Sequence, residues 1–135
     1  MSTAKWQNIA GSKIIFLFQA QRQEVEENVI ELLDEGLEFY TEMLETLDKT
    51  YHIGLEQYYD VLEIRSSDTK IRCALVSAQK CLLCLGDLAR YKEMIQNTSN
   101  YGKARQYYQK ASHIDTRNAK PFNQLAILAW TAKRK

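Results

Sequence analysis

The chain has 135 residues, 45% of them apolar and 26% charged, with one proline and five glycines. This composition excludes fibrous and disordered classes, and such a small number of helix breakers favours a single all-helical domain. The net charge is only +1, but residues 24–48 hold ten acids and no base, whereas residues 101–135 hold eight bases and one acid. Such charged faces are usually just solvated, although the basic end could attract phosphates or acidic peptides.

No apolar run is long enough to cross a bilayer, and the N-terminal residues lack the apolar core of a secretory signal. We therefore expect no membrane partner and a cytoplasmic location, with the nucleus as a second compartment. The three cysteines, Cys73, Cys81 and Cys84, include one C-x-x-C, but no second C-x-x-C or His pair completes a metal site. Because all three share one helical face, we expect small buried core residues, with no metal and no cofactor.

Two helical segments open the chain. The first runs from about Ala4 to Gln21, is weakened by Gly11 and Ser12, and contains the apolar run Ile14–Phe18. The second runs from Glu24 to about Lys49 and is amphipathic, with its acids on the solvated face. Its apolar face is predicted to comprise Val25, Val29, Leu32, Leu33, Gly36, Tyr40, Met43, Leu44 and Leu47.

The pattern weakens between Tyr51 and Asp68, where we expect at most a short helix followed by a loop. Asp68 or Ser67 is a suitable N-cap for the next helix, which is predicted from Thr69 to about Met94. Apolar residues cover most of the circumference of that helix, so it is predicted to be the buried centre of the fold. A loop follows at residues 96–100.

The third helix contains the polar sequence Gly86-Asp87-Leu88-Ala89-Arg90-Tyr91. On a helix, Asp87 lies three residues before Arg90 and four before Tyr91, so its carboxylate can hold both side chains. A fixed guanidinium next to a phenol suits capture of a small anion such as phosphate. The alternative is a structural ion pair inside a helical bundle, and spacing alone leaves both open.

The last third has the pattern of a tetratricopeptide repeat. Ala104, Tyr108 and Ala111 match its A-x3-F-x2-A core, and a short turn follows at residues 115–118. Leu85-Gly86 supplies the L-G pair of the preceding helix. We therefore predict one helical hairpin plus the first helix of another, running from Pro121 to Trp130. The packing positions of that last helix are Phe122, Leu125 and Ala126.

These stretches carry a family resemblance. GDLARY resembles the G-D-x-x-R-Y motif of 14-3-3 proteins. Together with YGKARQYYQKASHID and RNAKPFNQLAILA, it resembles the 14-3-3-like, tetratricopeptide-containing domain of the nonsense-mediated mRNA decay adaptors, the SMG proteins related to the telomerase-associated Est family. The form NYGKARQYYQKA is most like the member that elsewhere carries a PIN-type nuclease. The likeness is strong over residues 81–135 and weak over 25–47.

The resemblance implies an antiparallel helical bundle or solenoid. Residues 1–135 would form a single partial 14-3-3-like domain, in which 81–135 is the tetratricopeptide-like part. The chain begins where the family's domain is already under way and stops one helix into a repeat, so we expect a fragment or short isoform, truncated at both ends, whose final helix lacks a neighbour.

The resemblance also implies a phosphopeptide site. Arg90 would bind the phosphate, Tyr91 would add a second contact, and Asp87 would orient the arginine. Asn123 matches an asparagine that grips the peptide backbone, with a plain surface amide as the alternative. Lys13, which follows Trp6 in the sequence, is the candidate for the family's second phosphate-binding cation.

The implied function is an adaptor in nonsense-mediated decay that binds a phosphorylated RNA helicase of the Upf type, with other decay adaptors as further partners. No catalytic residue is predicted, because His52 and His113 have no nucleophile or ligand set nearby. Two alternatives stay open: a phosphate-independent helical scaffold, and an RNA- or telomerase-associated module. RNA contacts would use Lys103, Arg105, Lys110 and Arg117 with Tyr107, Tyr108 and His113.

Overall fold

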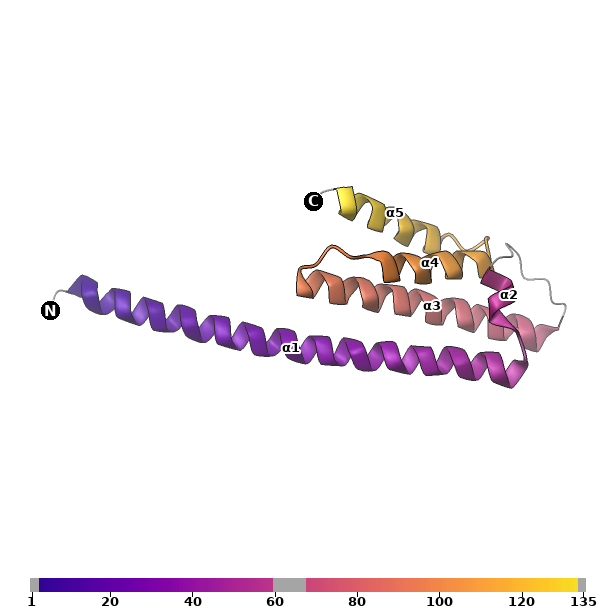
Figure 1. Ribbon diagram of the computed structural model, residues 1–135, viewed down its shortest axis with the longest axis horizontal. Helices are drawn as coiled ribbons and strands as arrows, with labels where there is room; N and C mark the ends of the chain where they lie inside the picture. Colours follow the sequence, from indigo (N-terminus) through magenta and orange to yellow (C-terminus); the bar gives the residue numbers. More distant parts are fainter. Residues whose placement is uncertain (1–2, 60–67, 134–135) are drawn as a thin grey trace. The chain divides into compact units, whose positions relative to one another are not determined.

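The computed structural model describes residues 3–59 and 68–133, with side chains from residue 11 onward. Within these residues the secondary structure is entirely helical, which confirms the all-α prediction, and none of the helices combines the length and apolarity needed to span a membrane. The helices are α1 (Thr3–Tyr51), α2 (Leu55–Tyr59), α3 (Thr69–Gln96), α4 (Gly102–Ile114) and α5 (Lys120–Lys133) (Figure 1).

Helix α1 is continuous where the sequence predicted two separate segments. No proline or glycine separates those segments, and side chains one turn apart bridge the expected junction. Arg22 Nε lies 3.2 Å from Glu26 Oε1, and Gln23 Nε2 donates to Glu27 Oε1 at 3.3 Å. Pairs with this spacing stabilise a helix, so the prediction of two segments was wrong.

Internal contacts divide the chain into two units, residues 1–32 and residues 33–135, and the boundary falls inside α1. In the N-terminal unit the run Ile14–Phe18 exposes between 52% and 69% of each residue. Val25 and Leu32 are also exposed, as is Met43 further along α1, so the predicted apolar face is wrong at these three positions. The assignment of residues 1–135 to a single domain stays a prediction.

In the second unit, the C-terminal part of α1 packs antiparallel to α3. Lys92 Nζ lies 2.6 Å from Asp34 Oδ1, and a Cβ on Gly36 would lie 3.0 Å from Cδ1 of Leu88. Further along, the side-chain hydrogen bond with Cys84 raises the pKa of Tyr40. Residue numbers thus rise on α1 as they fall on α3, as in an antiparallel pair.

The core lies between α3 and α4, which contact each other along their lengths, and α5 contacts α4 in turn (Figure 1). Ala104, Tyr108 and Ala111 are buried almost completely, which confirms their predicted packing role. Their assignment to a tetratricopeptide repeat stays a prediction. In α5, Pro121 and Leu128 are buried and Leu125 is half-buried. Phe122 and Ala126 are exposed, so their predicted packing role is wrong. Ile127 and Trp130 each expose 44% or more as well.

A buried amide joins α3 to the turn after α4. Gln79 is only 3% exposed, and its Nε2 donates to the backbone oxygens of Ala111 (2.8 Å) and Asp115 (3.1 Å). Its Oε1 accepts from Asn118 Nδ2 at 3.0 Å. All three polar contacts of this side chain are therefore satisfied without solvent, as a buried amide requires.

Side chains at the helix ends determine where two helices begin. Asp68 caps α3 by accepting from the backbone N–H of Lys70 at 2.9 Å, as predicted, while Ser67 lies outside the described residues. After α1 the chain turns through Gly54, whose φ of 68° favours glycine. Asp48 Oδ1 accepts from the N–H groups of Gly54 (2.9 Å) and Leu55 (3.2 Å), so one carboxylate starts α2.

The cysteine prediction holds only in part. Cys81 is buried and Cys84 is half-buried, but Cys73 is exposed. Cys73 lies near the start of α3, where Thr69, Val76 and Ser77 are exposed as well. The first turns of α3 are thus covered on fewer sides than its second half, a difference that the apolar content of the helix does not reveal.

Candidate anion-binding site

One carboxylate oxygen joins three helices at the second half of α3. Asp87 Oδ1 accepts a hydrogen bond from the Tyr108 hydroxyl on α4 at 2.6 Å and another from Gln124 Nε2 on α5 at 3.1 Å. Arg90 Nη2, one turn further along α3, lies 3.6 Å from the same oxygen. Two neutral donors and one cation therefore share the charge of Asp87.

The guanidinium of Arg90 is held on one edge and on one face. Its Nε donates to the Tyr108 hydroxyl at 3.3 Å, and its Cζ lies 4.8 Å from the centre of the Tyr91 ring. The side chain is 15% exposed. Burial by itself would lower the pKa of Arg90, but the hydrogen bond to Tyr108 and the charge of Asp87 raise it, so the group stays a cation.

The absence of a side chain at Gly86 makes this geometry possible. A Cβ built there would lie 2.3 Å from Cε1 and 2.6 Å from Cδ1 of Tyr108, so the ring occupies the space of the missing side chain. Burial and the hydrogen bond to Asp87 raise the pKa of Tyr108, which keeps its hydroxyl protonated and able to donate. The glycine of the motif is thus a packing requirement as well as a sequence signature.

The structure brings together three of the five predicted site residues. Arg90 contacts both Asp87 and Tyr91 as described, and Tyr91 is 44% exposed. Asn123 is exposed on α5, next in sequence to the Gln124 that contacts Asp87. Lys13 is exposed and lines a surface hollow of about 320 Å³ in the N-terminal unit, so its part in this site stays a prediction.

Sequence reasoning missed Tyr108 and Gln124 as members of the site. Tyr108 matches an aromatic packing position of the repeat, and its ring does pack there. The signal was its hydroxyl, because the repeat consensus has phenylalanine at that position and a fully buried phenol requires a partner. Gln124 carried no comparable signal, since a glutamine on a short helix is usually a surface residue.

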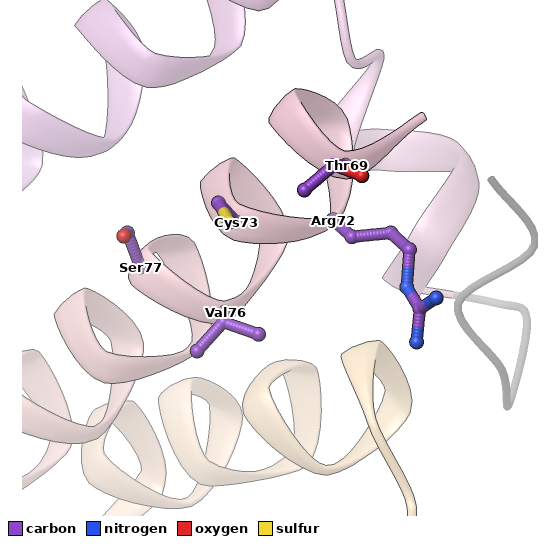
Figure 2. Close-up of a pocket in the computed structure, with 5 residues that line it drawn as sticks. All are labelled: Thr69, Arg72, Cys73, Val76 and Ser77. Atoms are coloured by element: carbon purple, nitrogen blue, oxygen red, sulfur yellow. The ribbon is translucent and has the colours of Figure 1, made fainter. Parts of the chain in front are cut away.

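A second arginine of α3 lies in a different setting. Thr69, Arg72, Cys73, Val76 and Ser77 line a hollow of about 480 Å³, and all five come from the first turns of this one helix. Figure 2 shows the Arg72 side chain extending away from Cys73 and Ser77. A hollow lined by a single helix offers no converging groups from another element, so it is a weaker candidate site.

Several of the residues considered for RNA contact are engaged within the protein, whereas Lys103 and Arg105 are exposed. Tyr108 is fully buried, and His113 Nδ1 hydrogen-bonds the backbone oxygen of Tyr59. Lys110 Nζ lies 5.0 Å from the centre of the Tyr59 ring. Burial raises the pKa of the Tyr59 hydroxyl to about 12. Tyr108 is therefore not available for the stacking of RNA bases on exposed aromatic rings of α4. The described residues contain no group of side chains arranged to hold a metal ion.

Comparison with known proteins assigns the chain to a family. Residues 17–96 match the family model "Telomerase activating protein Est1". The chain is 42% identical over 106 residues to a telomerase-binding protein EST1A of Danio rerio, which covers 77% of this chain and 7% of that protein. It is 30% identical over 120 residues to the nonsense-mediated mRNA decay factor SMG7 of the same fish, covering 80% of this chain and 10% of the relative.

A further relative is the human decay factor SMG5, 27% identical over 107 residues. The chain thus spans a tenth or less of the length of these relatives. The predicted kinship with the Est-related SMG adaptors is confirmed, while the likeness to the member with a PIN nuclease stays a prediction. Because the family model covers more than half of the chain, this protein belongs to the Est1 family.

Proposed function

We propose that this chain is a phosphoserine- or phosphothreonine-dependent adaptor module of nonsense-mediated mRNA decay, acting in the cytoplasm on a phosphorylated RNA helicase of the Upf type. Its membership of the Est1 family supports this role, as do relatives that are named decay factors. The proposal concerns binding without covalent chemistry. Other decay adaptors are the further partners we expect.

The observation that carries the proposal is the fixed guanidinium of Arg90. An arginine that is already held in place loses little conformational freedom when it binds a phosphate, so more of the interaction energy appears as affinity. The donors on Asp87 reduce the repulsion that a nearby carboxylate would exert on a phosphate. Tyr91 is exposed beside Arg90 and offers a phenolic donor, and Asn123 on α5 offers an amide for the peptide backbone.

The test is a titration of this chain with two peptides from the helicase that differ only in one phosphoserine. Wild type should bind the phosphorylated peptide at least tenfold more tightly, since charge-assisted hydrogen bonds contribute about 1.5–3 kcal/mol each. Arg90→Glu should remove that preference while the helical content stays unchanged. Arg105→Glu makes the same charge change at an exposed position of α4 and should keep most of the preference.

Equal affinity of wild type for both peptides would refute phosphate recognition and favour a phosphate-independent helical scaffold. Loss of preference in Arg105→Glu to the same extent as in Arg90→Glu would show that net charge, and not the Arg90 site, attracts the peptide.

A telomerase-associated role is the second candidate. It is favoured by the 42% identity with a relative named as a telomerase-binding protein. Its test is direct binding of the chain to purified telomerase, with Arg90→Glu measured in parallel. Binding that survives this substitution would assign the telomerase contact to a different surface.

A further inference from the structure

We propose that Tyr108 and Gln124 are positioning residues for phosphate binding. Both donate to Asp87, and Tyr108 also accepts from Nε of Arg90. Together they orient the guanidinium so that its Nη1–Nη2 edge is presented to phosphate oxygens. This inference rests on the proposed function and adds to it the residues that orient the ligating group. Neither residue belongs to the G-D-x-x-R-Y stretch, because they come from α4 and α5.

The edge assignment follows from which nitrogens are already in use. A guanidinium is a planar fork of five N–H donors, and Nε shares one edge with Nη2. Nε donates to the Tyr108 hydroxyl, and Nη2 faces Asp87 Oδ1. The ring of Tyr91 lies over one face of the same group. Bidentate contact with two phosphate oxygens therefore falls to the edge formed by Nη1 and Nη2.

The Tyr108 hydroxyl is suited to this task because its single proton is directed. It donates to Asp87 at 2.6 Å, so a lone pair is left to accept from Arg90 Nε at 3.3 Å. The ring itself cannot turn aside, since it is fully buried and packed against Gly86. The Tyr108 hydroxyl thus links Asp87 to Arg90 through two hydrogen bonds, in addition to the direct contact of the two side chains at 3.6 Å.

Gln124 connects these hydrogen bonds to α5, the helix that carries Asn123. Its amide donates to the same Oδ1 that the Tyr108 hydroxyl contacts. The position of α5 is therefore linked to the orientation of Arg90 by a hydrogen bond from α5 to Asp87. A phosphopeptide whose backbone contacts Asn123 would favour the docked position of α5 and, through Gln124, the oriented form of Arg90.

The first experiment removes only the Tyr108 hydroxyl. In the full 135-residue chain, Tyr108→Phe should reduce the preference for the phosphoserine peptide over the serine peptide about tenfold. Tyr107→Phe removes a neighbouring hydroxyl from the same helix and should leave the preference unchanged. Hydrogen exchange at Arg90 Nε–H can be followed by ¹⁵N NMR, with the signal assigned from its loss in Arg90→Lys. Exchange should be slow in wild type and fast in Tyr108→Phe. A ring that only fills space would not change this exchange rate.

A second variant keeps the inference testable if Tyr108→Phe folds poorly. Gln124→Met preserves the size of a half-buried side chain and should lower the preference about threefold, with unchanged thermal unfolding. Full preference in both variants, with Arg90 Nε–H still protected, would overturn the positioning role while leaving phosphate recognition standing. Absence of any preference in wild type would instead refute the proposed function, and the inference with it.

Discussion

The two arginines of α3 differ in what surrounds them. Arg72 and Arg90 are eighteen residues apart, about 27 Å along the helix, and project in the same direction. Arg72 is exposed and lines a hollow made by one helix (Figure 2). The guanidinium of Arg90 is instead held by groups from α3 and α4. The same residue type on the same helix is thus exposed at one end and held by neighbouring side chains at the other.

This difference shows that packing of neighbouring helices, and not the arginine itself, makes the candidate site. At the Arg90 end, Gly86 lets α4 approach closely enough for Tyr108 to reach both Asp87 and Arg90. At the Arg72 end, the hollow is lined by residues of α3 alone.

The largest effect is expected from Gly86→Ala. The added Cβ would meet the Tyr108 ring at 2.3 Å, and because that ring is fully buried, the two helices would have to separate. We expect the free energy of unfolding to fall by about 2–3 kcal/mol, the usual cost of overpacking a core. The measurement is urea unfolding followed by circular dichroism.

Gly11→Ala is the matched control, because nothing lies within 4 Å of a Cβ at Gly11. It should leave the unfolding midpoint unchanged or raise it slightly, as alanine favours a helix by about 0.5–1 kcal/mol over glycine. A Gly86→Ala protein as stable as wild type would show that the close contact of α3 with α4 is not needed.

Gln79 lies between the two arginines of α3, and its hydrogen bonds have a structural role only. Gln79→Ala should lower the free energy of unfolding by about 2 kcal/mol, because the backbone oxygens of Ala111 and Asp115 would be left without their buried donor. Gln109→Ala, at an exposed position of α4, should change it by less than about 0.5 kcal/mol. Equal effects of the two changes would contradict the role assigned to Gln79.

Lysine replacements compare the two arginines directly. Arg90→Lys keeps the charge but loses the planar fork, so affinity for the phosphoserine peptide should fall about tenfold, or about 1.4 kcal/mol. Arg72→Lys should leave the affinity unchanged within about twofold. Isothermal titration calorimetry with the phosphorylated and plain peptides measures both. A comparable loss in Arg72→Lys would place Arg72 in the binding surface too.

The smallest effect concerns the charge field at the Arg72 end. The hydrogen bond from the Arg117 side chain, with a further contribution from the charge of Arg72, holds the pKa of Asp115 below its ordinary value. Because the pKa of Asp115 is lower in the folded state, its ionised carboxylate stabilises the fold at pH values above the unfolded-state pKa of about 3.8. That stabilisation is lost as the pH falls through the folded-state pKa. Arg117→Gln should therefore raise the Asp115 pKa most, and Arg72→Gln should raise it less.

Carboxyl ¹³C NMR titration measures this pKa directly, and Arg105→Gln is the control that should not move it. A larger shift in Arg72→Gln than in Arg117→Gln would mean that Arg72 is held close to Asp115, which would remove the contrast with Arg90.

Much of the fold was predictable from local pattern. The start of α3 at Asp68 followed from capping chemistry, and burial of Ala104 and Ala111 followed from repeat spacing. The continuity of α1 was missed, because the apolar pattern changes between Gln21 and Glu24 and that change was read as a break between two helices. The exposure of Cys73 was missed because the apolar content of a helix does not tell which of its turns have neighbours.

The sequence by itself determined the positions of α3 and α4 and the motif residues Asp87, Arg90 and Tyr91, because these depend on short-range spacing along one helix. It also indicated the family, through motifs spread over residues 81–135. Only the tertiary structure decided that Tyr108 and Gln124 share the carboxylate of Asp87 and that Gly86 makes room for the Tyr108 ring. These contacts join residues 21 and 37 positions apart, and no helical periodicity relates such positions. The orientation of Arg90 is therefore a property of how three helices pack.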